Sequence, residues 1–529
     1  MAVQPTARRL WHSIDWALTC TALVYVSIVL LAVLTLNPYF AQTWDVATFL
    51  QAAHRFLDGG NPSDLYAQSR AAQTWPYAYP PLHAFVVALA LLIGNILHLL
   101  PDYVWARVPA MIGDLGVAWA LYRIVSRSAN AKLAHLAFIL WLFNPITFYD
   151  TAVQGHFEAE WLFFVLLAYI WYDESQVLLA AAALAVATLF KQTALLFSLP
   201  FWIAVLLERS RRRQFLPSVA LYIVIGGIVC LPFLLYSNDF LYSNLTYVEN
   251  VPVQTQSWIV ALLGWTRTSG DALSSDFFLL RYQTLVTMLL SLVIAFVGIR
   301  RGWDAYLIGA LIALAFFLTS KKVMGYYYVM LWPFLLATCL PKRRYGWLLV
   351  TLIVVSWISL SPYYAAWVDH AHWWIYALLG SLNSLFFLIL MVQLIRDRGS
   401  PVSLPEDETG LRAWTSSWTL LVVSLGLTAG AAFAAFLQPI FSSTSSPIRP
   451  PIVAAGLEGP AVLAFLGLVV LICIATFAAT RWARSLAPGP RSRAAWGIVL
   501  AFAPLFFAVY TLTKESTAIF ELALKALGV

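Results

Sequence analysis

The chain has 529 residues, of which 61% are apolar and only 11% are charged, against about 25% charged in a typical soluble protein. Because a soluble domain cannot bury so much apolar surface, this composition excludes a cytosolic globular enzyme, a disordered chain and a fibrous protein. In a membrane protein the net charge of +7 reports orientation rather than a nucleic-acid partner. We therefore predict an all-α, polytopic transmembrane protein of the cell membrane with about 13–15 spans.

Basic clusters separate the apolar runs and predict how the spans are oriented. The positive-inside rule places these clusters in the cytoplasm, so an even number of spans lies between one cluster and the next. The clusters are Arg8/Arg9, Arg123/Arg127/Lys132, Arg209/Arg211/Arg212/Arg213, Arg300/Arg301, Lys342/Arg343/Arg344, Arg396/Arg398/Arg412 and Arg481/Arg484/Arg491/Arg493.

The predicted spans follow from the apolar runs and from this parity. The run Leu82–Leu100 must not cross the membrane, and we expect it to be re-entrant or to lie in the outer interface. The run Gln176–Leu207 must be two short helices broken near Lys191, which then faces the outer side. The other named spans are Ile14–Leu36, Tyr103–Val125, Leu216–Tyr236, Phe277–Gly298, Asp304–Thr319, Tyr326–Leu340, Gly346–Leu360, Trp373–Ile395, Trp414–Leu437, Pro460–Thr480 and Ala495–Leu512.

A segment rich in proline and acidic residues near position 400 suggests how the chain is divided. We expect a catalytic transmembrane module over 1–345, additional transmembrane helices over 346–396, a cytoplasmic linker over 397–412 and a C-terminal transmembrane module over 413–529. The unusual polar residues collect on the predicted outer side of the first module.

The first outer loop begins with an amphipathic pattern. Apolar residues recur at helical spacing from Val46 to Leu57, which predicts a helix on the membrane surface that starts near Asp45 and ends at Gly59-Gly60. A carboxylate at this position stands at the lipid–water boundary, where it can accept a proton from a sugar hydroxyl. The alternative is that Asp45 only stabilises the N-terminus of the helix.

The same loop ends in an aromatic and proline-rich turn, Trp75-Pro76-Tyr77-Ala78-Tyr79-Pro80-Pro81. The prolines stop the loop and open the next helix. Tyr77 and Tyr79 are candidates to contact sugar hydroxyls, and they serve equally well as interface anchors in a rigid turn.

Polar residues also collect at the outer end of the spans near residue 155. Gln154, His156 and Glu158 are candidate substrate ligands, because ionisable groups at membrane depth are costly and functional by default. His156, Glu158 and Glu160 lack the i, i+4 spacing of a helical metal pair. We therefore predict no metal site and no cofactor, with a divalent metal on these residues as the less favoured alternative.

Lysines on the predicted outer side run against the positive-inside trend. Lys191 lies within an apolar run and needs either an anionic partner or an exit to water. The adjacent Lys321 and Lys322 stand beside a tyrosine cluster that includes Tyr327. Such a pair is suited to holding a phosphate at the membrane surface, and the alternative is a solvated loop.

The order of these short motifs resembles that of integral-membrane glycosyltransferases with the C-type (GT-C) fold, which use polyprenyl-phosphate sugars. Mannosyltransferases of the PIG-M type and of the bacterial polyprenyl-phosphomannose type are the families most similar in this pattern. The resemblance covers residues 14–345. The motifs include Trp44-Asp45, Gly59-Gly60-Asn61-Pro62, Tyr79-Pro80-Pro81-Leu82, Asn144-Pro145, Gln154-Gly155 and Lys321-Lys322-Val323.

The resemblance implies a role for each candidate residue. Asp45 would be the general base, and Lys322 or Lys321 would contact the donor phosphate. Lys191 and Arg107 would also belong to the phosphate-binding set, although Arg107 is equally open to a structural pairing with Asp114 seven residues later in its span. The candidate substrate-binding residues are Tyr77, Tyr79, Gln154, His156, Glu158 and Tyr327.

These observations predict an inverting glycosyltransferase whose active site lies on the extracytoplasmic face. It would transfer a hexose, with mannose favoured, from a polyprenyl-phosphate sugar to a lipid-linked or glycan acceptor. We see no Gly-rich phosphate loop, which agrees with a donor that is not a nucleotide. The alternatives are a multi-pass transporter or lipid flippase and a non-catalytic scaffold. The transporter is disfavoured because the ionisable groups gather near one face and no repeat symmetry is visible.

Overall fold

The protein is described here from a computed structural model, over residues 16–40, 44–58, 61–66, 77–247, 253, 255–262, 280, 282–342, 345–360 and 373–396. The predicted linker, 397–412, and the predicted C-terminal module, 413–529, lie outside the described residues. Every secondary-structure element within these ranges is a helix, so the predicted all-α class is confirmed.

The elements are α-helices joined by short 3₁₀ and π-helical turns. In chain order they are α1 (Trp16–Phe40), α2 (Trp44–Leu57), η1 (Pro62–Tyr66), α3 (Leu82–Leu97), α4 (Asp102–Trp105), α5 (Val108–Ser128), α6 (Ala131–Leu142), α7 (Pro145–Phe148), η2 (Tyr149–Gln154), α8 (Glu158–Asp173), α9 (Val177–Phe190), α10 (Ala194–Leu207), η3 (Arg212–Gln214), α11 (Phe215–Tyr236), α12 (Asp239–Leu241), η4 (Tyr242–Thr246), α14 (Ile259–Leu262), α16 (Gln283–Arg300), α17 (Ala305–Thr319), η5 (Gly325–Leu331), α18 (Trp332–Cys339), α19 (Tyr345–Leu360) and α20 (Trp373–Arg396).

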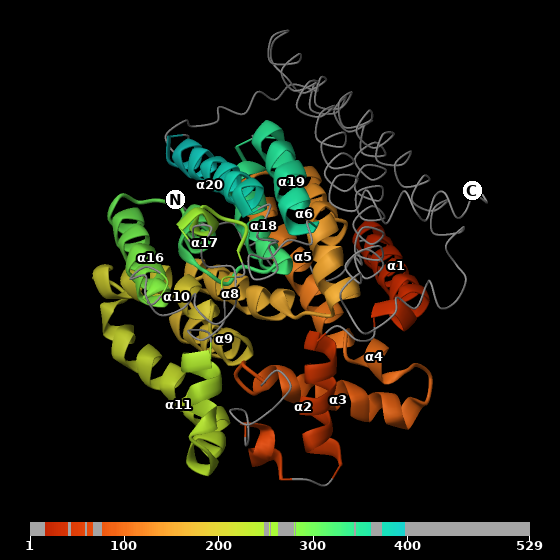
Figure 1. Ribbon diagram of the computed structural model, residues 1–529. Helices are drawn as coiled ribbons and strands as arrows, with labels where there is room; N and C mark the ends of the chain where they lie inside the picture. The colour runs from red at the N-terminus through yellow and green to blue at the C-terminus, as the bar shows by residue number, and fades with distance from the viewer. Residues whose placement is uncertain are drawn as a thin grey trace, which may run out of the picture.

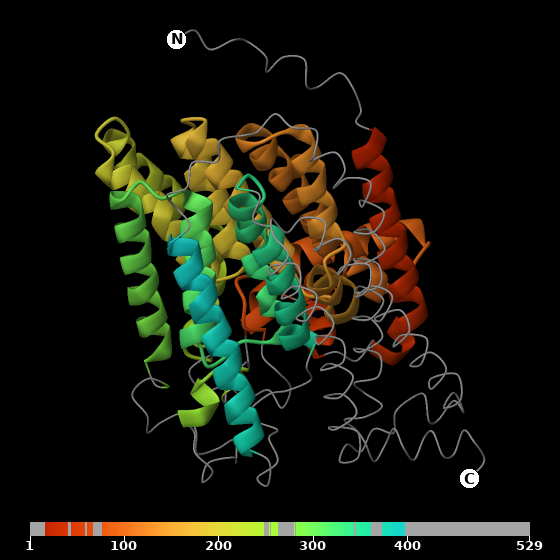
Figure 2. The ribbon, with the colours of Figure 1, turned by 90° about the horizontal axis from the view of Figure 1, so that it is seen from above.

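The long helices form a bundle with a common direction. Helices α1, α16 and α20 run roughly parallel to one another in Figure 2. Three described segments are long and apolar enough to cross a membrane: 102–128, 212–236 and 283–300. Large apolar side chains on α11 and α16, such as Ile228 and Val293, are exposed, as expected for a surface that faces lipid.

Two of the sequence predictions concern segments that depart from a simple span. The run 176–207 is indeed two helices, α9 and α10, and the break falls at residues 191–193. The predicted span 326–340 begins as the 3₁₀ helix η5 and continues as α18, so its first half is not α-helical. Both irregular segments face the same end of the bundle as α2, and both carry candidate site residues.

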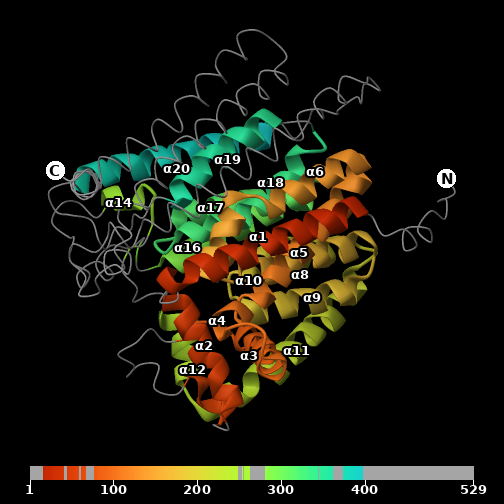
Figure 3. The same ribbon diagram turned by 90° about the vertical axis from the view of Figure 1, so that its right-hand side faces the viewer.

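The amphipathic helix predicted after Asp45 is α2, which has Asp45 in its first turn and ends at Leu57. It packs against α3, where the rings of Phe56 and Phe85 lie with centroids 4.5 Å apart. Helix α3 lies across the bundle: it runs horizontally in Figure 1 and is seen end-on in Figure 3, where α1 and α20 run along the picture. That 82–100 does not cross the membrane stays a prediction, which this orientation favours.

Helices α5 and α8 pack closely and run in the same direction, so their first turns lie together at one end of the bundle and their last turns at the other. Gly113 permits the approach, because a Cβ there would lie 2.8 Å from the backbone nitrogen of Glu160. At the far end of the pair, Arg123 binds Glu174 at 2.6 Å, and Arg127 contacts the same carboxylate. The basic cluster therefore lies at the end of the bundle opposite to the first turn of α8.

We expect labelling of single cysteines to separate the two ends. In a cysteine-free background, Asp58→Cys and Asp102→Cys should react with a membrane-impermeant maleimide from one side of the membrane, because both side chains are exposed and both lie near His54 of α2. Ser210→Cys, which is exposed beside the basic cluster 209–213, should react only from the other side. Labelling of Asp102→Cys together with Ser210→Cys would show that α3 crosses the membrane.

Candidate active site

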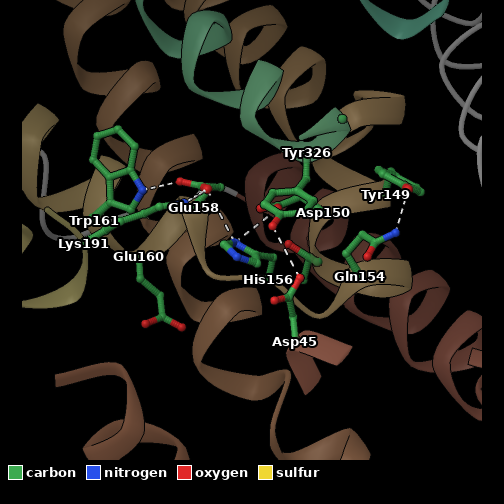
Figure 4. Close-up of polar contacts among 12 residues, drawn as sticks. Asp45, Tyr149, Asp150, Gln154, His156, Glu158, Glu160, Trp161, Lys191 and Tyr326 are labelled. Carbon is green, nitrogen blue, oxygen red and sulfur yellow. Dashed lines mark hydrogen bonds and ion pairs between the residues drawn. The ribbon is translucent and has the colours of Figure 1, made fainter. Parts of the chain in front are cut away.

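Five segments of the chain converge at one end of the bundle and carry most of the predicted site residues. They are the first turn of α2, the turn 77–81 before α3, the segment 149–158 from η2 into α8, the break 191–193 and the segment 320–327 from α17 into η5. Figure 4 shows that Asp45, His156, Glu158 and Tyr326 are neighbours there. Turns and helix ends form the site because they leave polar side chains free to meet between the helices.

Asp45 lies beside η5. The Tyr326 hydroxyl donates a hydrogen bond to Oδ2 of Asp45 at 3.4 Å. Burial raises the pKa of the Asp45 carboxyl, and the nearby Lys322 ammonium, then the Lys191 ammonium and the Tyr326 hydroxyl, act to lower it. A carboxylate in this environment is a more effective proton acceptor near neutral pH than one in free solution.

His156 occupies the middle of the site. Its ring stacks on Tyr326 with centroids 4.1 Å apart, and its Nε2 lies 3.3 Å from the hydroxyl oxygen of Tyr79. On the other side of the ring, Nδ1 lies 3.4 Å from Oε1 of Glu158 and 3.9 Å from Oδ1 of Asp150. The imidazole therefore links the aromatic and the acidic parts of the site.

Lys191 has an anionic partner, as expected for a lysine within an apolar run. It forms an ion pair with Glu158, whose second carboxylate oxygen accepts a hydrogen bond from the indole of Trp161. The Lys191 ammonium also lies over the ring of Tyr327, 4.0 Å from its centroid, with Tyr79 at 5.7 Å. A buried cation and anion held in this way stabilise each other only while both are present.

The two adjacent lysines lie in different environments. Lys321 is fully buried, and its backbone N–H donates to Oε1 of Gln283 at 3.0 Å. Lys322 faces the site: its ammonium lies 5.4 Å from the ring centroid of Tyr247 and interacts electrostatically with Asp45. Burial lowers the pKa of Lys322 to about 8, although Asp45 acts in the opposite direction.

Three predicted residues have contacts that serve the surrounding backbone or neighbouring side chains. The Tyr77 hydroxyl donates to the Pro80 carbonyl at 3.2 Å and accepts from the backbone N–H at residue 84, 3.1 Å away, which fixes the turn before α3. Gln154 donates to the Tyr149 hydroxyl at 2.6 Å. The Arg107 guanidinium donates to the carbonyls of residues 152 and 103 at 3.2 and 2.7 Å, which ties α5 to η2.

The buried carboxylate of Asp114 also serves the packing of the helices. The hydroxyls of Tyr25 and Thr151 both donate to its Oδ2, the latter at 2.6 Å. These contacts join α1, α5 and η2. The pairing of Asp114 with Arg107, one of two alternatives that the sequence left open, is not among the contacts described for either side chain.

Several site residues were not singled out from the sequence. Tyr326 belongs to the tyrosine cluster that the sequence analysis noted, but nothing in the sequence marks it as the partner of Asp45. Asp150 was also missed, as was the pairing of His83 with Glu160, 3.1 Å apart. Their signal was present, since ionisable residues within apolar segments are functional or paired by default.

The arrangement offers a carboxylate that accepts a proton, a cation beside it and aromatic rings around both. Among the residues that the structure describes, no three His, Cys, Asp or Glu side chains are grouped so as to hold a metal ion. A carboxylate and a cation placed in this way can deprotonate a hydroxyl next to a stabilised anion.

We expect the ion pair of Lys191 and Glu158 to be essential for folding as a pair. Lys191→Met leaves the Glu158 carboxylate buried without its cation, which should cost roughly 3–5 kcal/mol and lower the midpoint of thermal unfolding. Adding Glu158→Gln in the same chain should recover much of the loss. The control, Arg127→Met at the exposed cluster, should change stability by less than about 1 kcal/mol. An unchanged midpoint for Lys191→Met would show that the pair contributes little.

Comparison with known families shows that part of the chain is similar to a family of enzymes that transfer sugars. Residues 77–320 match the sequence model of glycosyltransferase family 87. This range contains Tyr79, His156, Glu158 and Lys191, whereas Asp45 lies before it. No curated protein matches the chain. Together with the apolar helices, the family match indicates a glycosyltransferase of the membrane.

Proposed function

We propose that the protein transfers a hexose, with mannose favoured, from a polyprenyl-phosphate sugar to a lipid-linked or glycan acceptor. The reaction takes place on the extracytoplasmic face and inverts the anomeric centre. The observation that carries the proposal is the placement of the Asp45 carboxylate beside the Lys322 ammonium at the end of the bundle where the amphipathic helix α2 lies. A base and an anion-stabilising cation side by side are what a direct displacement at a sugar phosphate requires.

Asp45 acts as the general base. The acceptor hydroxyl loses its proton to the Asp45 carboxylate as its oxygen attacks the anomeric carbon of the donor sugar. The bond between the anomeric carbon and the phosphate oxygen breaks on the opposite side, so the configuration inverts. The base is supplied by the first turn of α2, at the height where a lipid-borne sugar meets the protein.

Lys322 stabilises the leaving group. The donor phosphate is a diester with one negative charge, and it leaves as polyprenyl phosphate with a second charge developing on it. A cation in place before the reaction stabilises this new charge without reorganisation. Lys322 suits this role better than Lys321, because Lys322 interacts with Asp45 whereas the Lys321 side chain is fully buried.

The surroundings of the site support a lipid-linked donor at the outer face. Helices α2 and α3 meet next to Asp45, and α3 presents exposed apolar residues such as Leu89 and Ile96. The basic residues Arg123 and Arg127 lie at the opposite end of the bundle, which the positive-inside rule assigns to the cytoplasm. A transporter is less well supported. The ionisable groups of a transporter are expected near the middle of its bundle, whereas the site residues here lie at one end.

We expect Asp45→Asn to lower the rate of sugar transfer by about 10²–10⁴, while expression and donor binding survive. The amide keeps the shape of the side chain but cannot accept the proton. The measurement is sugar transfer in membranes, with a panel of polyprenyl-phosphate sugars and extracted lipids as acceptors.

Two carboxylates of the same outer loop serve as matched controls for Asp45. Asp58 lies at the end of α2 and Asp64 in η1, and both have ready structural roles in turns. Asp58→Asn and Asp64→Asn should keep activity within about tenfold of the unchanged protein. Normal turnover by Asp45→Asn, with a folded but inactive Glu158→Gln, would move the base to the 154–160 segment.

We expect Lys322→Met to raise the Michaelis constant for the donor at least about tenfold, because a lost charge-assisted contact costs roughly 1.5–3 kcal/mol. The rate should also fall above about pH 8 in the unchanged protein, as Lys322 loses its proton. Lys322→Arg should move this alkaline limb to higher pH, because a guanidinium stays protonated.

The neighbouring lysine provides the control for Lys322. Lys321→Met should leave the donor constant unchanged even where it lowers stability, since that side chain is buried. A donor constant that responds to Lys321→Met and not to Lys322→Met would reverse the assignment. If Lys322→Arg leaves the fall in rate at alkaline pH where it was, a group other than Lys322 causes that fall.

A further inference from the structure

We propose that Tyr326 is a positioning residue for the reaction: its hydroxyl orients the Asp45 carboxylate, and a column of stacked rings holds its own ring in place. This inference rests on the proposed role of Asp45 as the base. The hydrogen bond to Oδ2 of Asp45, 3.4 Å long, joins residues 281 positions apart and so links η5 to the first turn of α2. Figure 4 shows the Tyr326 hydroxyl directed toward the carboxylate.

The ring column consists of Tyr326, His156, Phe157 and His83, stacked in this order. The centroids of successive rings are 4.1, 4.7 and 3.9 Å apart, and their planes are inclined by 28°, 12° and 18°. The last ring is anchored by Glu160, whose Oε2 lies 3.1 Å from Nδ1 of His83. Because each ring is covered by the next, the Tyr326 ring cannot turn away from Asp45 without breaking the stack.

The same column also holds α2, the helix that carries Asp45, in place. Phe49 lies one helical turn after Asp45, so both side chains share one face of α2. The Phe49 ring packs edge-on against three rings of the column, with centroids 4.6 Å from His83, 5.3 Å from Phe157 and 5.7 Å from His156. The same stacked rings therefore position both the Asp45 carboxylate and the Tyr326 hydroxyl.

A close approach beside the column fixes α2 further. Val46, the residue after Asp45, packs on Gly155, where an added Cβ would lie 2.5 Å from Cγ2 of Val46. Gly155 also has a φ of 61°, a backbone conformation that favours glycine. The first turn of α2 thus rests on the backbone just before His156, which leaves the Asp45 side chain little freedom to move away from Tyr326.

A carboxylate that must accept a proton in one direction benefits from a fixed orientation. A donor on Oδ2 sets the plane of the Asp45 carboxylate and stabilises its charged form. Removal of the Tyr326 hydroxyl alone should leave the stacked ring in place and lose only this effect. Tyr326→Phe therefore separates orientation of the base from packing of the column.

We expect Tyr326→Phe to lower turnover about tenfold with little change in the Michaelis constant for the donor, since the contact is a single hydrogen bond to a charged group. The acid limb of the pH–rate profile should move to higher pH, because the charged form of Asp45 loses a donor. Sugar transfer in membranes across a range of pH measures both.

The other groups around Asp45 stay unchanged in this variant, so a shift of the acid limb is attributable to the lost hydroxyl. They are Lys322 and Lys191 as cations, Glu158 as the nearby anion, and the hydroxyls of Tyr79, Tyr327 and Tyr247. Tyr328→Phe is the matched control: its ring is buried on the same 3₁₀ helix and packs on Phe317 and Phe387, away from Asp45. It should leave both turnover and the acid limb unchanged.

Four further outcomes decide between the role of Tyr326 and the role of Asp45. A slower Tyr326→Phe with an unmoved acid limb, or normal kinetics in this variant while Asp45→Asn is inactive, overturns the role of Tyr326 alone. An equal loss in Tyr328→Phe would assign the effect to packing of η5 and overturns it as well. Full activity of Asp45→Asn overturns the proposed base, and with it the reason for Tyr326 to orient that carboxylate.

Discussion

The buried ion pair between Lys191 and Glu158 is the interaction on which the rest of the site depends. In an apolar interior neither charge is stable alone, so the two side chains fix the positions of the segments that carry them. Lys191 reaches Glu158 only because the apolar run 177–207 is broken there, and Glu158 begins α8 directly after His156. One electrostatic requirement thus sets the break between α9 and α10, the start of α8 and the position of the imidazole.

Aromatic packing connects this ion pair to Asp45, the proposed base. The rings of Tyr326, His156 and Phe157 continue from the acidic part of the site to α2, and Phe49 seats that helix edge-on against them. Asp45 is contributed by a short amphipathic helix that packs on these rings through Phe49 and on Gly155 through Val46. Its precision therefore comes from helices that form the interior of the bundle, which is the usual way for a rigid scaffold to place a loop-borne group.

Local patterns in the sequence were sufficient to predict α2, with Asp45 in its first turn, and the two short helices around Lys191, because spacing of apolar residues and charge parity are local properties. They were insufficient for contacts made across the bundle. Nothing in the sequence distinguishes Lys321 from Lys322, since which of two adjacent side chains faces a site depends on the path of the backbone after α17. The contacts of Arg107 with main-chain carbonyls and the partnership of Tyr326 with Asp45 likewise arise only when distant segments meet.

The crosswise orientation of α3 bears on how the thickness of the bilayer would affect the site. Its exposed side carries residues such as Leu89 and Ile96, while its first turn holds His83 at the end of the ring column. In the proposed orientation α3 lies at the level of the headgroups and contacts the proposed active site, so it would couple the depth of that site to the thickness of the bilayer. On this proposal the chain length of the lipids would be a variable of the reaction, alongside donor and acceptor.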